Sequence, residues 1–246
     1  MIRLLPEVVG HRGAAADAPE NTLASFSRAA EAGAAMVEFD AKLTADGAVI
    51  LMHDDTLDRT TDGSGPVAAA TLAGIRPLDA GTWFGSDWRG TPVPTLQETL
   101  ALLVERGLSA NIEIKPCPGR EIETAEAVVA VVRQYWPRRG VQPLLSSFAR
   151  DSLAAARDAA PELPRGLLFW EKPGDWSQAA EALACHSVHC AAEHLSPEWA
   201  AEIKRLGYEL AVYTVNEPGL ARQLRGWGVD SIITDRPGAL LRALRG

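Results

Sequence analysis

Residues 37–54 are typical of two strands joined by a turn, yet they carry charged side chains that a buried sheet does not favour. Glu38 and Asp40 stand two positions apart, so in a strand both side chains point to the same face. Side-by-side carboxylates repel each other unless they are exposed or a cation lies between them. His53 ends the second strand-like run. The pattern indicates either a half-solvated hairpin or a site that gathers charge for chemistry.

The turn between the two runs decides which carboxylate faces the histidine. If residues 44–47 form a four-residue turn, the antiparallel register places Glu38 opposite His53. If residues 46–47 form a two-residue turn, Asp40 takes that place instead. Both registers therefore predict that the histidine lies close to the carboxylates.

Polar residues also end other strand-like runs of the chain. His11 and Arg12 follow an apolar run near the N-terminus, and Glu113 and Lys115 share one face at the end of a later run. If these runs are neighbouring parallel strands, their carboxyl ends meet at one edge, where barrel enzymes place their active sites. The side chains are then expected to converge with those of the first stretch.

Three carboxylates at neighbouring strand ends form an oxygen-rich site that suits a hard divalent cation such as Mg²⁺ or Ca²⁺. Two histidines beside it can act as base and acid, because the ordinary histidine pKa of about 6.5 permits both roles near neutral pH. Acid and base catalysis contribute ~10²–10⁴-fold each. Enzymes reach ~10⁶–10¹⁷-fold, and more for phosphate-ester hydrolysis. The histidines alone are therefore too weak, and a cation is expected to supply part of the remainder.

Each of these residues also has a structural interpretation. A strand-end histidine is often structural or exposed, Arg12 and Lys115 can pair with the acids, and Glu113 can be a salt-bridge residue. Arg12 and Lys115 can equally bind an anionic substrate. The combination of acids, cations and histidines favours a catalytic metal site.

The elements that must position these residues alternate regularly along the chain. Each expected helix follows a strand run, and repeated units of this length predict an α/β protein with a TIM (β/α)₈ barrel. The alternative is an open doubly wound sheet, but the glycine-rich dinucleotide fingerprint of that fold is absent. The expected strands are residues 8–10, 37–40, 49–53, 110–115, 144–148, 166–169, 187–189, 210–215 and 231–234. The expected helices lie between residues 22 and 33 and at 96–107, 121–136, 150–159, 179–183, 197–206, 218–227 and 238–244.

This assignment contains one strand run more than a barrel needs. The two runs of the first stretch share one helix, so one of them is either a hairpin arm or a barrel strand that lacks its helix. Residues 55–94, after the His53 strand, are rich in Gly, Thr, Asp and Pro and predict an inserted loop, lid or small subdomain. Its Trp83, Phe84 and Trp88 either seal it onto the barrel or contact substrate. Residues 1–246 are thus predicted to form a single domain.

Composition excludes several classes of function. The 246 residues carry a formal net charge of −8 without a Lys/Arg stripe, which argues against nucleic-acid binding. No apolar run approaches the ~20 residues of a membrane span, so no stable membrane association is expected. A strand-like run begins almost at once, which leaves no room for a signal peptide and predicts a cytoplasmic protein.

The cysteines agree with a reducing compartment, because there are three of them, an odd number. Residues 185–190 contain two cysteines and two histidines, which are zinc-type ligands. Strand alternation places His186 and Cys190 on one face and His189 on the other. The segment is therefore expected to be a strand rather than a metal site.

The same residues resemble the glycerophosphodiester phosphodiesterase family, of the phospholipase C-like phosphodiesterase superfamily. The resemblance covers nearly the whole chain, with the motifs in the right order. They are His11-Arg12-Gly13, Pro19-Glu20-Asn21-Thr22, Glu38-x-Asp40, Leu43-Thr44-x-Asp46-Gly47, His53-Asp54, Arg59-Thr60-Thr61-Asp62-Gly63 with Gly65, Glu113-Ile114-Lys115, Ser147-Phe148, Tyr213-Thr214-Val215-Asn216 and Ile233-Thr234-Asp235-Arg236-Pro237. One departure is Tyr213, where tryptophan is common in the family.

The resemblance implies a TIM barrel that hydrolyses a small-molecule glycerophosphodiester to sn-glycerol 3-phosphate and an alcohol. It implies that a divalent cation, Mg²⁺ or Ca²⁺, is held by three ligands, that two histidines are the general acid and base, and that two cationic residues bind the phosphate. The glycerol 2-hydroxyl would attack first in one version, giving a cyclic phosphate that water opens. The implied residues are Glu38, Asp40 and Glu113 for the metal, His11 and His53 for catalysis, and Arg12 and Lys115 for the phosphate.

Three other functions compete with this one. A lysophospholipase D-type relative would need an apolar route for an acyl chain, for which residues 55–94 are the candidate. A non-catalytic glycerophosphate-binding barrel would be expected to have lost a metal ligand or a histidine, and none is missing. A metal-dependent isomerase or lyase also gathers carboxylates at strand ends, but flanking histidines with Arg12 and Lys115 suit a phosphodiester better. The headgroup alcohol, the preferred metal and the oligomeric state are left open.

Overall fold

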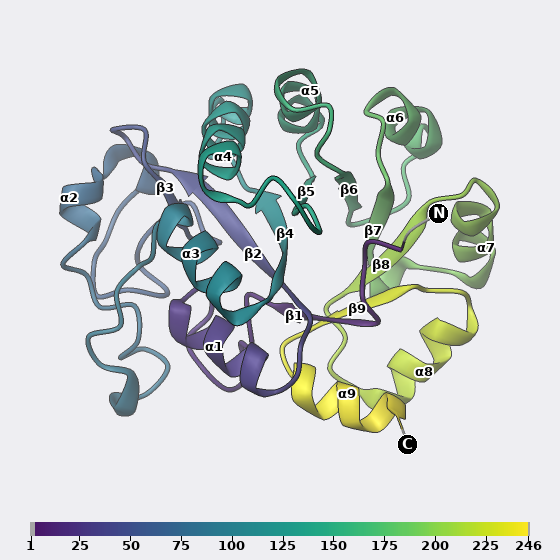
Figure 1. The fold of residues 1–246 in the computed structure, drawn as a ribbon, viewed down its shortest axis with the longest axis horizontal. Coiled ribbons are helices and arrows are strands. Elements are labelled where there is room, and N and C mark those ends of the chain that lie inside the picture. Colours follow the sequence, from purple (N-terminus) through teal and green to yellow (C-terminus); the bar gives the residue numbers. More distant parts are fainter. Residues whose placement is uncertain (1–2, 246) are drawn as a thin grey trace.

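The barrel is closed by eight parallel strands in the computed structural model, which describes residues 3–245 (Figure 1). Strand β1 pairs with both β9 and β2, which closes the ring. This confirms the predicted TIM barrel. The strands are β1 Val8–His11, β2 Met36–Leu43, β4 Ser109–Ile114, β5 Leu144–Ser147, β6 Arg165–Phe169, β7 Ser187–Ala191, β8 Glu209–Tyr213 and β9 Ser231–Thr234.

Helices surround the ring on its outer side (Figure 1). The best-defined boundaries belong to α3, where Thr95 and Glu98 form a capping box and Gly107 ends the helix in the left-handed conformation with a φ of 66°. All eight predicted helices are confirmed within the described residues. They are α1 Leu23–Glu31, α3 Leu96–Arg106, α4 Glu121–Tyr135, α5 Arg150–Ala159, α6 Trp176–Ala182, α7 Pro197–Arg205, α8 Pro218–Gly226 and α9 Pro237–Arg245.

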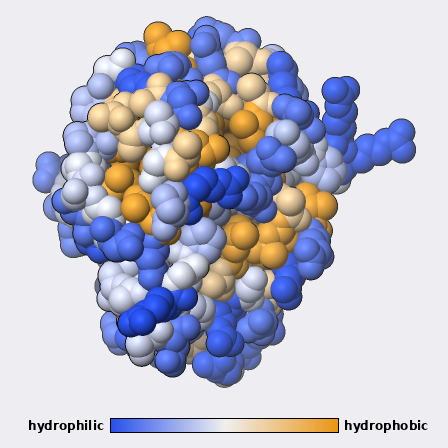
Figure 2. Space-filling model, turned by 90° about the vertical axis from the view of Figure 1, so that its left-hand side faces the viewer, coloured by the Kyte–Doolittle hydropathy of each residue, from blue (hydrophilic) through white to orange (hydrophobic). Residues whose placement is uncertain are grey.

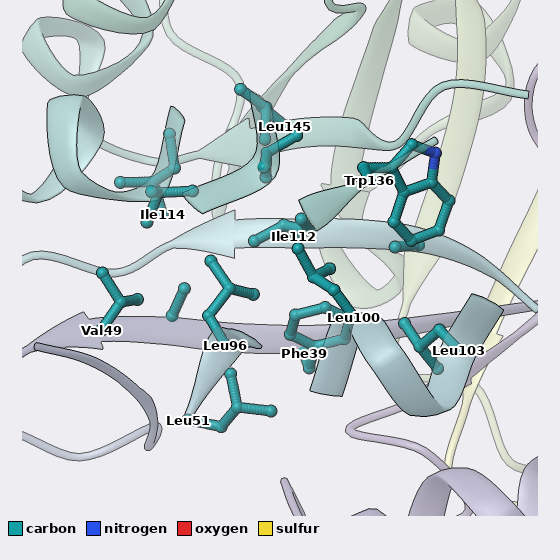
Figure 3. Packing of buried hydrophobic residues seen from close by; sticks show 14 of the residues in the cluster. Phe39, Val49, Leu51, Leu96, Leu100, Leu103, Ile112, Ile114, Trp136 and Leu145 are labelled. Atoms are coloured by element: carbon teal, nitrogen blue, oxygen red, sulfur yellow. The ribbon is translucent and has the colours of Figure 1, made fainter. Parts of the chain in front are cut away.

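The main core lies between the strands and the helices. Leu96, Leu100 and Leu103 recur at helical spacing on α3 and are fully buried. Figure 3 shows them beside Phe39 of β2 and Ile112 of β4, which belong to the same cluster. Each such side chain contributes about 1.5–3 kcal/mol by leaving water. This packing holds β2 and β4, the two strands that bear the carboxylates, in a fixed place.

A second, smaller core fills the inside of the barrel. It joins inward-facing apolar residues of several strands to a residue that precedes β1. The cluster consists of Leu5, Val9, Met36, Leu144, Ala211 and Ile233. Polar side chains toward the carboxyl ends of the strands therefore stand on an apolar base.

The extra strand is a hairpin arm, β3 Val49–Leu51, which among the described strands pairs with β2, in antiparallel fashion. Ala41 faces Leu51, so the loop between the strands has three residues, 45–47. Gly47 takes a φ of 82°, the left-handed conformation that completes such a loop. Both predicted registers are wrong by one residue, because the sequence alone did not distinguish this loop from two- and four-residue turns.

The corrected register changes how His53 reaches the site. Met52 lies opposite Asp40 and donates its backbone N–H to the Asp40 carbonyl at 3.0 Å. His53 lies beyond the end of β3, in the connection that follows, so its side-chain direction is not set by strand alternation.

Residues 55–94 form a small packed unit beside α3, at the left of Figure 1. It contains α2 Leu72–Ile75 and two short 3₁₀ helices, Val67–Ala69 and Ser86–Trp88. The insert has its own apolar cluster, which includes Ile50 of β3. Figure 2 views this side and shows small hydrophobic areas among hydrophilic residues. The function of the insert as a lid stays a prediction.

The aromatic residues of the insert contact one another rather than the strand ends. The ring centroids of Trp83 and Phe84 lie 5.7 Å apart, and those of Phe84 and Trp88 lie 6.2 Å apart. The Arg28 guanidinium of α1 lies 5.9 Å from the centroid of Trp88. These contacts favour the interpretation in which the aromatics seal the insert onto the barrel.

Two features bear on where the protein acts. Within residues 3–245, no helix has both the length and the apolar character required to cross a membrane. The cysteines Cys117, Cys185 and Cys190 are all free thiols. The cytoplasmic location stays a prediction.

Candidate active site

Three carboxylates meet at the carboxyl end of the barrel. Glu38 and Asp40 come from β2 and Glu113 from β4, and the strand register places Asp40 beside Glu113. All three are buried, and each offers an oxygen within 4.8 Å of the others. Among the described His, Cys, Asp and Glu residues, this is the group whose geometry could hold a metal ion. The structure thus brings the three predicted ligands together.

Burial and mutual repulsion disturb the ionisation of these acids. Burial, Asp40 and Glu113 raise the pKa of Glu38 well above its usual range. Burial and the Asp40 charge raise the pKa of Glu113 to about 7. Burial also opposes ionisation of Asp40, but Arg12, Lys115 and His53 lower its pKa below the usual value. The three acids therefore cannot all ionise easily unless further positive charge joins them.

Arg12 and Lys115 lie against the same carboxylates. Arg12 contacts Asp40 with its Nε at 3.3 Å, and the Lys115 ammonium lies 2.9 Å from Glu113 and 3.5 Å from Asp40. Burial lowers the pKa of Lys115, but the charges of Asp40 and Glu113 raise it by more. The pKa therefore lies above its ordinary value, and the ammonium is charged. Both cations are thus ion-pair partners of the acids.

The turn after β1 has a backbone that fixes Arg12. Its φ is 48°, an uncommon conformation for a residue with a side chain, and Gly13 follows with a φ of 91°. The Arg12 backbone N–H donates to Glu38 at 3.1 Å, and its carbonyl accepts from the Ser25 hydroxyl at 2.8 Å. A Cβ on Gly13 would lie 2.3 Å from the Ser25 hydroxyl oxygen, so only glycine fits here.

The sequence analysis assigned no function to two residues that support this cluster. Asn21 donates from its side chain to Asp40 at 2.9 Å and accepts from the Asp40 backbone N–H at 3.1 Å. Glu20 accepts from Arg12 at 2.7 Å and from Arg59 at 2.8 Å. Both lie just before α1, whose first turn is capped by Thr22, because its side chain accepts from the Ser25 N–H.

His11 is oriented by an aspartate from the opposite end of the sequence. Its Nδ1 lies 2.6 Å from an oxygen of Asp235, just after β9. Asn216 donates to the other Asp235 oxygen at 2.7 Å. Burial opposes ionisation of Asp235, but the hydrogen bond with His11 lowers its pKa. Asp235 and Asn216 appear in the motifs of the sequence, and the signal that could have identified them as functional is their place just after the ends of β9 and β8.

His53 has a matching arrangement. Its Nδ1 lies 2.7 Å from Asp54, which in turn accepts from the Arg59 guanidinium at 2.7 Å. Burial lowers the pKa of His53, against the opposing effect of Asp40, so the neutral imidazole is favoured near pH 7. In both histidines the carboxylate engages Nδ1 and leaves Nε2 as the atom able to exchange a proton with a ligand.

A cavity of about 260 Å³ connects these groups. One side, the carboxylate half, contains Glu38, Glu113, Arg12 and Lys115, with Asp40 beside Glu113. The other side, the aromatic half, consists of Phe148, Leu168, Trp170 and Tyr213 from β6, β8 and the residues that follow β5 and β6. The full lining is His11, Arg12, Glu38, His53, Asn111, Glu113, Lys115, Phe148, Leu168, Trp170, His189, Tyr213, Thr214 and Ile233.

The aromatic half is held by few polar contacts. Tyr213 donates its hydroxyl to the Phe169 carbonyl at 2.8 Å, and its ring meets that of Phe148 edge to face at 6.1 Å. The tyrosine at position 213 therefore packs into the wall of the aromatic half. Phe148 is 42% exposed and Trp170 is 55% exposed, so this half opens to solvent.

Residues 187–190 of the cysteine and histidine segment lie in β7, as predicted, and Cys185 and His186 precede this strand. His189 is completely buried inside the barrel, where its Nε2 lies 2.9 Å from the Ser187 hydroxyl. Cys190 belongs to the outer core beneath the helices. The two residues thus lie on opposite faces of the strand, which confirms the predicted alternation.

The donor set suits a hard divalent cation. The three carboxylates and the two cations Arg12 and Lys115 together leave one negative charge when all are ionised. A divalent cation would turn this into one positive charge, which the single charge of a phosphodiester neutralises. Carboxylate oxygens are the ligands that Mg²⁺ and Ca²⁺ prefer. The arrangement can therefore bind an anionic ester and transfer protons on either side of it.

Comparison with known proteins agrees with this geometry. The sequence model of the glycerophosphoryl diester phosphodiesterase family matches residues 11–239. A glycerophosphodiester phosphodiesterase of Caldanaerobacter subterraneus subsp. tengcongensis is 36% identical over 242 residues, 97% of each chain. One of Bacillus subtilis is 33% identical, over 97% of this chain and 86% of the relative. The structure of an Oleispira antarctica phosphodiesterase in complex with the product sn-glycerol-3-phosphate has a TM-score of 0.96, with 37% identity over 98% of both chains.

Proposed function

The chain belongs to the glycerophosphoryl diester phosphodiesterase family. We propose that the pocket at the carboxyl ends of its strands is where the glycerophosphodiester is hydrolysed. The enzyme hydrolyses glycerophosphodiesters to sn-glycerol 3-phosphate and an alcohol. One observation supports the placement of the reaction most strongly: a cluster of three buried carboxylates adjoins the cavity that is lined by two histidines whose Nδ1 atoms are each engaged by an aspartate. Such a combination has no evident structural purpose, because buried like charges destabilise a fold.

Glu38, Asp40 and Glu113 are the proposed ligands of a divalent cation, Mg²⁺ or Ca²⁺. When bound, the cation polarises a phosphoryl oxygen and offsets the charge that develops during displacement. The pairing of β2 with β4 fixes the positions of these carboxylates relative to one another, which supports a set of ligands that is in place before a cation binds.

Arg12 and Lys115 are the proposed phosphate-binding residues. Both already lie at the edge of the carboxylate cluster, and both are only partly exposed, with 16% and 23% of their side chains accessible. A phosphate oxygen that approaches Arg12 and Lys115 displaces solvent from them and leaves the packing of the apolar core unchanged. Their contacts with Glu20 and Glu113 keep the two cations in place before substrate arrives.

His11 and His53 are the proposed general acid and base. Asp235 and Asp54 hold the proton on Nδ1 of each ring, so each Nε2 faces the reaction. One histidine takes the proton from the nucleophile, which is either water or the glycerol 2-hydroxyl. The other gives a proton to the oxygen of the departing alcohol. In the second version a cyclic phosphate forms first, and water then opens it with the two roles reversed.

A lysophospholipid is the second candidate substrate. The exposed rings of Phe148 and Trp170 at the pocket support it, because they could contact the beginning of the acyl chain that a lysophospholipid carries on its glycerol. The aromatic residues of the insert give it no support, since they do not line the pocket. A water-soluble diester remains the better candidate for a pocket of about 260 Å³. The proposed place of action is the cytoplasm.

The test is to supply purified protein with glycerophosphocholine and to follow glycerol 3-phosphate through a coupled dehydrogenase. Separate reactions contain EDTA, Mg²⁺ or Ca²⁺. Release that EDTA abolishes and one cation restores is the expected result. Release that continues unchanged in EDTA would contradict the metal-dependent reaction. Activity on lysophosphatidylcholine micelles without activity on glycerophosphocholine would favour the second candidate.

A further inference from the structure

The floor of the pocket carries two buried polar side chains that have unpartnered atoms. Asn111 on β4 is 1% exposed and His189 on β7 is 0% exposed, and both line the cavity. Among the described residues, neither the Asn111 Oδ1 nor the His189 Nδ1 has a hydrogen-bond partner. A buried polar atom without a partner costs about 1–3 kcal/mol. Two of them facing one cavity indicate a ligand group that they are built to bind.

The two side chains lie deeper in the barrel than the reacting groups. Asn111 precedes Glu113 by two positions on the same strand face, which places it about 7 Å further inside along β4. His189 approaches from the other side of the ring, on β7. Ile233 is the apolar neighbour that completes this floor. Whatever occupies the space between the two polar side chains is thus enclosed by the barrel.

The side chain of His189 occupies space that is free because the neighbouring strand has a glycine there. Gly166 on β6 faces it, and a Cβ on Gly166 would lie 2.8 Å from the His189 Nε2 and 2.8 Å from the Ser187 hydroxyl oxygen. Ser187 engages the Nε2, and the Nδ1 of this pocket-lining residue has no hydrogen-bond partner among the described residues. Burial lowers the pKa of His189 to about 4, so the ring is neutral at pH 7. A neutral imidazole and an amide suit a neutral polar group.

We propose that Asn111 and His189 bind the primary hydroxyl of the glycerol moiety and thereby select glycerol esters. A hydroxyl fits because it donates and accepts hydrogen bonds at once, as an amide and a neutral imidazole require. This inference rests on the proposed function, which places the phosphate at the carboxylate half. Of the two alcohols on that phosphate, the variable one extends past the exposed Phe148 and Trp170. The glycerol, which every substrate shares, then occupies the enclosed floor.

The experiment compares two diesters with the same choline leaving group. One carries glycerol and the other carries propane-1,2-diol with the phosphate on carbon 1, which lacks the primary hydroxyl but keeps the 2-hydroxyl for attack. The wild-type enzyme is expected to show a kcat/KM about 10- to 100-fold higher for the glycerol diester, because the analogue leaves both floor residues unpartnered. In Asn111→Leu and His189→Leu this preference should fall to within about threefold, through loss of activity on the glycerol diester alone.

Ser231→Ala is the matched control variant. The Ser231 hydroxyl is also buried without a partner in the described structure, but it does not line the pocket. The substrate preference of this variant should equal that of the wild type. A variant that lowers kcat/KM equally for both diesters, and so keeps the wild-type ratio, would show that the floor is merely structural and would overturn the proposal.

A measurement on the wild-type enzyme covers the case in which the variants fail to fold. Glycerol 3-phosphate is expected to inhibit about tenfold more strongly than propane-1,2-diol 1-phosphate. Equal inhibition constants would contradict the proposal. If the metal-loaded enzyme hydrolyses neither diester, the proposed function itself fails. Hydrolysis of both without preference leaves that function intact and refutes only the hydroxyl site.

Discussion

The two halves of the pocket differ in charge and in exposure. The carboxylate half places Glu38, Asp40 and Glu113 in the interior, each at most 7% exposed. The aromatic half presents Phe148 and Trp170 at 42% and 55% exposure. Buried charges require partners in fixed positions, whereas exposed rings tolerate different neighbours. On this difference rests our proposal that the first half determines the reaction and that the second half accommodates the part of the substrate that varies.

The strongest way to break the carboxylate half is Glu113→Gln. We expect kcat/KM to fall by roughly 10⁴-fold, because the bound cation contributes several kcal/mol and each tenfold corresponds to about 1.4 kcal/mol. In EDTA the variant should be at least as stable as the wild type, since one of three repelling acids is gone. A coupled assay and thermal melts with and without metal provide both readings.

Glu105→Gln is the control. The Glu105 side chain is 73% exposed on α3, and this substitution removes the same formal charge outside the pocket. A Glu113→Gln enzyme that retains both its activity and its stabilisation by metal would show that this carboxylate is not a ligand.

Removal of either histidine tests the chemistry of the same half. His11→Ala and His53→Ala should each lower kcat/KM by ~10²–10⁴-fold on glycerophosphocholine, the usual contribution of a general acid or base. His186→Ala, at an exposed histidine outside the pocket, should leave the rate unchanged. A loss below tenfold for either pocket histidine would argue against its catalytic role.

The floor between the halves carries a titratable side chain, and its effect on stability depends on pH. Burial lowers the pKa of His189 from an ordinary value of 6.5 to about 4. Above pH 6.5 the ring is neutral in the folded and unfolded chains. Between pH 6.5 and 4 only the unfolded chain takes up a proton, so the free energy of unfolding falls by about 3 kcal/mol. Below pH 4 both states are protonated and no further change follows.

His189→Gln isolates this contribution, because glutamine keeps hydrogen-bonding atoms but does not titrate. Urea denaturation at pH 7 and pH 4, with EDTA throughout, should show that the variant loses about 3 kcal/mol less than the wild type. Equal losses in the two proteins would mean that His189 takes up its proton as readily in the folded chain as in the unfolded one.

The smallest effect is expected at the aromatic half. Trp170→Ala should raise the KM for a large headgroup by a few-fold and leave kcat nearly unchanged, because an exposed ring contributes about 1 kcal/mol or less. The KM for a diester with a small alcohol should not change. A drop in kcat of more than tenfold would mean that this half takes part in the reaction, and the comparison would then be wrong.

Much of this arrangement could be predicted from the sequence, because periodicity and residue type encode it. The alternation of strands and helices gave the barrel, and the spacing of Glu38 and Asp40 placed both on one face. The register of the hairpin was predicted wrongly. Two-, three- and four-residue turns all accept a glycine at residue 47, and only the backbone contacts of the folded chain decide among them.

The supporting contacts were harder to predict, because they join residues that are distant in the sequence. Asp235 reaches His11 across 224 positions, and Asn21 reaches Asp40 across 19. No local pattern expresses such pairings. The floor formed by Asn111 and His189 has the same origin, since β4 and β7 lie apart in the sequence and face each other only in the closed barrel.

We propose above all that His11 and His53 divide the acid and base roles at the carboxylate half. The most direct test measures kcat/KM of His11→Ala and His53→Ala on two diesters, glycerophosphocholine and glycerophospho-p-nitrophenol. The p-nitrophenolate group leaves without protonation, so the variant that lacks the acid should recover most of its rate on this substrate. The variant that lacks the base should stay ~10²–10⁴-fold impaired on both. Equal impairment of the two variants on both diesters would contradict the division of roles.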